Sequence, residues 1–145
     1  LAPGTIVEPL PHPKIPTKDA DGNPTGYLIP IYNATEPWPG PAPQQVYLTI
    51  VSPGAAKGPH LHRKRCGMFT CIKGDVRIEV RVAGVYTNYF SGESYGFQTI
   101  PVPPSAPSVI YNIGSEDAYV LNMPSPPWTA ADPDDHPVLT WNPPL

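Results

Sequence analysis

Charged residues are scarce in this chain, and their scarcity limits what the chain can bind. Lys, Arg, Asp and Glu make up only 14% of the 145 residues, and the net charge is −3. A protein that binds nucleic acid through its phosphates needs a basic face, and this composition offers no basic excess. No apolar run approaches the roughly 18 residues of a membrane-spanning helix. We therefore expect neither a nucleic-acid partner nor a membrane partner.

Cysteine is nearly absent as well. The two cysteines, Cys66 and Cys71, are separated by an odd number of positions, which places them on opposite faces of a single strand. A disulfide between them is therefore unfavourable. Unpaired cysteines favour a reducing, cytoplasmic location.

Helical periodicity is also missing, while proline is abundant. Proline breaks helices and interrupts sheets, and 24 of the 145 residues are proline. A hydrophobic share of 40% still suffices for a packed core. Short β-branched and aromatic runs alternate with turn residues, which predicts an all-β sandwich or barrel. We expect strands near residues 27–32, 46–51, 67–72, 76–82, 86–90, 94–100, 109–113 and 118–123.

The composition changes near residue 45. Residues 1–44 are rich in proline and weakly patterned, so we expect an extended N-terminal arm with one short strand. Residues 45–145 contain the remaining expected strands and end in a tail rich in Pro and Asp. The length suits a single domain.

Reactive side chains gather in residues 57–66. This segment holds two of the four histidines, four of the nine Lys and Arg residues, and one cysteine. If the segment is a strand, its side chains alternate between two faces. One face then carries His60, His62, Lys64 and Cys66, and the other carries Leu61, Arg63 and Arg65. A face of imidazole, ammonium and thiol groups is typical of a pocket lining.

Two spaced motifs resemble those of the cupins, a superfamily of small jelly-roll barrels. The first cupin motif is matched by Gly54, His60, His62 and Gly74, and the second by Pro103, Ser105, Ser108 and Asn112. The resemblance implies a single-domain cupin jelly-roll barrel. Two positions depart from it: Cys66 replaces the metal-binding Glu, and Ser108 replaces the last His ligand.

Within the cupins, the chain is similar to the dTDP-sugar 3,4-ketoisomerases, which work without metal. The similarity rests on the run from Lys57 to Lys64, on the strand from Phe69 to Gly74, and on Tyr47 in the preceding strand. The tail at 134–143 more distantly resembles the dTDP-4-dehydrorhamnose 3,5-epimerases, although 125–127 offers no counterpart of the epimerase tyrosine.

The resemblance implies a metal-independent isomerase or epimerase of a nucleotide-linked keto sugar, with no cofactor. A histidine titrates near neutrality and can move a proton between neighbouring carbons through an enediol. We expect His60 to be the base, His62 its partner and Tyr47 an orienting group. Lys57 or Lys64 would stabilise the enediolate oxygen. Ser108, Tyr111 and Trp128 complete the predicted substrate-binding set.

Three alternatives remain open. A metal-dependent cupin oxygenase, lyase or cyclase would use His60, His62 and a third ligand, for which Cys66 and Ser108 are poor replacements. A cupin isomerase or cyclase of a non-sugar ketone would use the same histidine pair. A carbohydrate-binding cupin without catalysis would bind sugar alone.

The resemblance also implies a homodimer, because arms in this fold class pair with the sheet edge of a neighbouring subunit, and open edges favour aggregation. Of the two remaining histidines, His12 lies between prolines without a partner, and we expect it at the surface. His136 lies beside Asp134 and Asp135 in the polar tail, and we expect it to be exposed.

Overall fold

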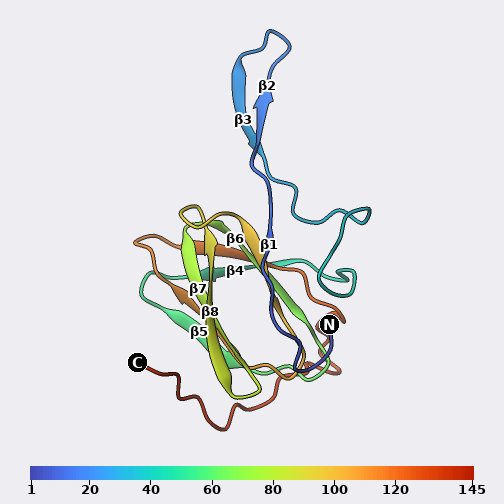
Figure 1. Cartoon of the computed structure of the whole chain (residues 1–145), viewed down its shortest axis with the longest axis vertical. Helices are drawn as coiled ribbons and strands as arrows, with labels where there is room; N and C mark the ends of the chain where they lie inside the picture. Colours follow the sequence, from blue (N-terminus) through green and yellow to red (C-terminus); the bar gives the residue numbers. More distant parts are fainter.

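The computed structural model describes all 145 residues, which form eleven strands and no helix. Two sheets face each other, and a separate hairpin projects beyond them (Figure 1). The five-stranded sheet has the order β1-β9-β6-β11-β4, and the four-stranded sheet has the order β5-β10-β7-β8. The strands are β1 (Leu10–Pro11), β2 (Ile15–Lys18), β3 (Pro24–Leu28), β4 (Tyr47–Val51), β5 (Ala56–His60), β6 (Gly67–Lys73), β7 (Asp75–Val82), β8 (Val85–Gly92), β9 (Gln98–Val102), β10 (Ser108–Asn112) and β11 (Ala118–Asn122). This arrangement confirms the predicted all-β jelly-roll class.

The chain contains no helix that could cross a membrane.

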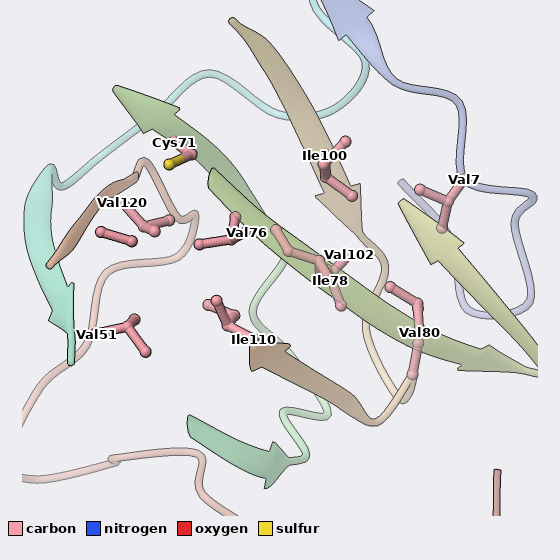
Figure 2. Close-up of a cluster of buried hydrophobic side chains, with 12 residues drawn as sticks. Val7, Val51, Cys71, Val76, Ile78, Val80, Ile100, Val102, Ile110 and Val120 are labelled. Atoms are coloured by element: carbon pink, nitrogen blue, oxygen red, sulfur yellow. The ribbon is translucent and has the colours of Figure 1, made fainter. Parts of the chain in front are cut away.

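The core lies between the two sheets, and β7 shows how the sequence creates it. Val76, Ile78 and Val80 are almost fully buried, and they alternate with Arg77, Glu79 and Arg81 on the outer face. Figure 2 shows the three apolar side chains of β7 facing branched side chains from the opposite sheet. The strand expected near residues 76–82 is therefore confirmed.

On several strands, the side chains that face the space between the sheets pack into the core at one end and line a cavity at the other. On β4, Val51 is buried in the core, but Tyr47 and Thr49 line an open cavity. On β6, Cys71 is buried in the core, and Phe69 lines the same cavity. One end of the space between the sheets is thus filled with side chains, and the other end is open.

The N-terminal segment is more regular than the sequence predicted. It forms three short strands instead of one, because β2 and β3 pair as an antiparallel hairpin despite their prolines. The hairpin stands clear of the barrel, and nearly all of its residues are exposed (Figure 1). Strand β1 pairs with β9, and the His12 side chain contacts the Thr99 hydroxyl at 2.6 Å. His12 is therefore half-buried, and the expectation that it would be exposed without a partner was wrong.

After β11 the chain forms no further strand but returns across one end of the barrel. It forms single β-bridges between Cys66 and Ser125 and between Leu61 and His136. This return brings the acidic tail to the segment that carries the histidine pair.

Candidate functional site

His60 and His62 line a cavity of about 250 Å³ at the open end of the barrel. Both sheets, the 62–65 turn and the C-terminal tail line the cavity. Its lining residues are Tyr47, Thr49, Lys57, His60, His62, Arg65, Phe69, Ser108, Ile110, Trp128 and Asp135. Of the predicted site residues, the structure brings together His60, His62, Tyr47, Lys57, Ser108 and Trp128.

A close approach between β5 and β10 positions His60. Ser108 pairs with His60 and Ile110 with Lys57, so the register shifts by one residue between the two pairs. Gly58 lies at this irregularity with φ of 117°, and a Cβ there would lie 2.6 Å from the Ser108 carbonyl oxygen. Only glycine fits such a conformation and such a contact. The sequence Lys57-Gly58-Pro59-His60 thus directs two functional side chains into the cavity.

The predicted alternation fails after His60, because β5 ends there and the chain turns at 62–65. Arg65, predicted for the opposite face, is buried beside His62 and lines the cavity. Lys64 points instead to solvent and pairs with Asp132 at 2.6 Å. Cys66 packs in a small cluster with Met68 and Met123. A period-two pattern holds only where the backbone is extended, and the turn ends it.

Asp134 holds this turn. One carboxylate oxygen accepts the backbone N–H groups of Lys64 and Arg65, both at 2.9 Å, and the other accepts that of Arg63 at 3.0 Å. His136 Nε2 lies 2.9 Å from the same carboxylate, and its side chain is 31% exposed, so the expected exposure of His136 is only partial. Burial alone raises the pKa of Asp134, but these contacts outweigh burial and hold its pKa well below the usual range.

His62 is fixed from several sides. Its Nδ1 lies 2.9 Å from the Asp134 carbonyl oxygen and 3.3 Å from the Asp135 carboxylate, while an Arg65 guanidinium nitrogen lies 3.1 Å away. Two acceptors, one of them the nearest group, favour a proton on Nδ1. Nε2 then carries the lone pair, and the same Arg65 nitrogen lies 3.4 Å from it. Burial lowers the pKa of His62; the Asp134 carbonyl raises it, Arg65 lowers it further and Asp135 raises it.

The two imidazole rings are nearly parallel. Their planes differ by 10° and their centroids are 6.4 Å apart. His60 is the more exposed of the two, and its ring forms no hydrogen bond within the chain. The site therefore combines one free imidazole with one that is held in place.

Tyr47 lines the cavity but does not hydrogen-bond to either histidine. Its hydroxyl accepts a hydrogen bond from Asn122 Nδ2 at 2.7 Å, and Asn122 Oδ1 accepts the Met68 N–H. The phenol is thus anchored to β11, the strand paired with β4.

Tyr111 and Lys64 do not reach the cavity. Along β10, the side chains of Ser108 and Ile110 line the cavity. Because side chains alternate along a strand, the Tyr111 side chain points to the outer face. There the Arg77 guanidinium lies 4.0 Å from the Tyr111 ring centroid. Ile110, the neighbour of Tyr111 on β10, therefore lines the cavity in its place.

Arg65 and Asp135 are the charged cavity residues that the sequence did not predict as site residues. Arg65 is only 5% exposed, and its guanidinium donates to the Pro133 carbonyl. The sequence signal that could have found them is the acidic group in the tail, from Asp132 to Asp135. In a chain with few charges, such a group of carboxylates indicates that cationic side chains lie nearby. No group of three His, Cys, Asp or Glu side chains is arranged to hold a metal ion.

A family model described as the polysaccharide biosynthesis C-terminal domain matches residues 35–136, which is more than half of the chain. The chain belongs to this family. The polysaccharide biosynthesis match includes the histidine pair and ends at His136, so it covers both walls of the cavity. No curated protein matches the chain in sequence.

Solved structures share the fold of this family member. A dTDP-sugar isomerase from Desulfovibrio desulfuricans G20 superposes with a TM-score of 0.78 at 14% identity, covering 91% of this chain and 83% of the other. The sugar 3,4-ketoisomerase QdtA from Thermoanaerobacterium thermosaccharolyticum, solved with TDP, gives 0.66 at 18% identity, with 87% and 85% covered. The capsular polysaccharide assembling protein CapF from Staphylococcus aureus gives 0.60 at 20% identity, with 86% of this chain and 34% of CapF covered.

Proposed function

We propose that this protein isomerises or epimerises a nucleotide-linked keto sugar by proton transfer through an enediol, without a metal ion. The observation that carries the proposal is the pair of parallel imidazoles in one cavity, one ring free and the other held. Such a pair suits a reaction in which one carbon loses a proton and its neighbour gains one.

In the proposed reaction His60 removes the proton from the carbon next to the carbonyl. The C–H electron pair forms the carbon–carbon double bond, and the carbonyl oxygen becomes an enolate oxygen. A proton then moves between the two oxygens, which His62 assists through its unprotonated Nε2. Return of the proton to the former carbonyl carbon gives the isomeric ketone, with no net oxidation or reduction. Delivery of a proton from solvent to the opposite face of the original carbon gives the epimer, and the proton on His60 is lost to solvent.

Charge at the cavity supports an anionic ligand. Lys57 and Arg65 line it, against the single carboxylate of Asp135. A local cationic surface in an acidic chain suits the diphosphate of a nucleotide sugar and an enediolate oxygen. Trp128, which is 45% exposed at the cavity, is placed to stack on a base or a sugar.

The comparisons support the same class of substrate. Structural neighbours include enzymes named as a dTDP-sugar isomerase and a sugar 3,4-ketoisomerase, and QdtA has been solved with TDP-4-keto-6-deoxyglucose. The description of the family, a polysaccharide biosynthesis C-terminal domain, also supports a sugar substrate.

The test is hydrogen exchange at the carbon next to the ketone of dTDP-4-keto-6-deoxyglucose in D₂O, followed by NMR. We expect wild-type protein to exchange this hydrogen, also after treatment with a chelator. His60→Asn should lower the rate by about 10²-fold or more, because it removes the base. His12→Asn is the matched control, since His12 contacts Thr99 and lies outside the cavity.

Wild-type protein that exchanges no deuterium would contradict the isomerase proposal. A rate unchanged in His60→Asn would remove His60 as the base, and a rate lost with the chelator would favour the metal-dependent alternative.

A further inference from the structure

The histidine segment depends on one residue of the tail. Asp134 is buried, and its carboxylate accepts three consecutive backbone N–H groups, those of residues 63–65. Three N–H groups of a turn that converge on one carboxylate form charge-assisted hydrogen bonds, which are stronger than neutral ones. The turn that begins at His62 therefore has its shape fixed by a side chain about 70 residues further along the chain.

The backbone of the same residue reaches the imidazole. The Asp134 carbonyl oxygen lies 2.9 Å from His62 Nδ1. Asp134 has φ of 52°, a left-handed conformation that Asp and Asn tolerate better than other side chains. This conformation allows the carboxylate to point at the turn while the carbonyl points at the ring.

We propose that Asp134 is the positioning residue of this site, which fixes the tautomer of His62 and places Arg65 beside it. The carboxylate shapes the turn that carries both side chains, and the carbonyl holds the proton on Nδ1. The effect on turnover rests on the proposed function, whereas the effect on the imidazole does not.

The decisive variant is Asp134→Asn. Asparagine tolerates the left-handed backbone equally well, so the change removes the negative charge without adding backbone strain. Its NH₂ group would oppose the backbone N–H groups that the carboxylate accepts. We expect the His62 tautomer, measured by ¹⁵N–¹H multiple-bond NMR, to be Nδ1–H in wild type and mixed in Asp134→Asn. We expect kcat to fall about tenfold or more, with a much smaller change in KM.

Asp132→Asn is the matched control. The Asp132 carboxylate pairs with the exposed Lys64 Nζ at 2.6 Å, lies outside the cavity and accepts no backbone N–H of residues 63–65. We expect it to leave the His62 tautomer unchanged. A tautomer that is lost in Asp132→Asn, or retained in Asp134→Asn, would overturn the proposal.

If Asp134→Asn fails to fold, amide hydrogen exchange in wild-type protein tests whether Asp134 holds the turn. Residues 63–65 lie outside every strand, so their amide protons should exchange quickly unless the carboxylate protects them. We expect slow exchange at all three, and fast exchange would overturn the proposal. If wild-type protein shows the expected tautomer and protection but no isomerisation, the proposed function fails and the positioning role stands.

Discussion

At the scale of single residues, the chemistry of the site depends on how His62 is kept neutral. Its imidazole is half-buried between the Arg65 guanidinium and the Asp135 carboxylate. Burial is the largest cause of its lowered pKa, and Arg65 adds to it. A neutral imidazole with an unprotonated Nε2 can accept a proton at neutral pH, which a protonated ring cannot do.

Removing the Arg65 charge should therefore raise the pKa of His62. We expect Arg65→Gln to move that pKa toward its ordinary value of 6.5, as followed by NMR titration of the ring. The exposed Arg63 provides the matched control, since Arg63→Gln changes the net charge equally. An unchanged pKa in Arg65→Gln, or an equal rise in Arg63→Gln, would contradict this account.

The sign of the linked stability effect follows from the direction of the shift. A lowered pKa means that the unfolded chain takes up the proton first, so this stabilisation is fully present above about pH 6.5 and is lost as the pH falls through the folded pKa. Denaturant unfolding at about pH 5.5 and 7.5 should show a smaller pH-dependent loss in Arg65→Gln than in wild type.

At the scale of elements, the contact between β5 and β10 controls where His60 lies. Strand β5 is an edge strand with every residue exposed, and it is paired only with β10. The backbones approach so closely at Gly58 that a side chain there would collide with the Ser108 carbonyl. The position of the histidine thus depends on a residue with no side chain.

Two glycine substitutions separate this contact from ordinary backbone strain. Gly54→Ala places a Cβ at φ of 72° in open space, so we expect a loss of about 1–2 kcal/mol in unfolding free energy. Gly58→Ala adds the collision with Ser108, so its loss should be clearly larger, and only this variant should also slow exchange at the substrate carbon. Equal losses in the two variants, measured by denaturant unfolding, would show that the contact has no energetic weight.

The sequence predicted the parts of this structure that depend on regular alternation. The β7 pattern and the position of His60 could be inferred because extended backbone determines them. His62 lies beyond the end of β5, where a contact with Asp134 holds it. Arg65 was predicted on the wrong face, and Lys64 was wrongly predicted to reach the substrate. Both errors arise because an interaction with Asp134, which no local pattern reveals, ends the strand. Tyr111 was misassigned because the choice of face on β10 depends on the register with β5 and β7.

At the scale of the whole molecule, apolar surface remains uncovered in two places. The β2–β3 hairpin exposes Tyr27 and Leu28 by 60% and 58%, and the edge strand β4 exposes Leu48 and Ile50 by 46% and 45%. A two-stranded hairpin has marginal stability alone, and an open edge strand readily pairs with another chain. A second copy of the chain would cover both features.

We therefore expect a homodimer with twice the 15.7 kDa mass of one chain, as measured by light scattering. Leu28→Lys should shift the protein toward monomer, because it places a charge on the exposed hairpin. Leu139→Lys, an equal change at a residue 89% exposed in the tail, should leave the mass unchanged. A monomeric mass for wild-type protein would contradict the prediction.

The hydrogen bonds between Asp134 and the turn at 62–65 also affect the order in which the protein folds. The contact between His62 and Asp134 joins segments 72 residues apart, whereas hairpins such as β7–β8 join near neighbours along the chain. Contacts of long sequence separation form late, since the chain must first lose the entropy of closing a long loop. An order of assembly follows, in which the local hairpins form early and the cavity gains its last wall when the tail arrives.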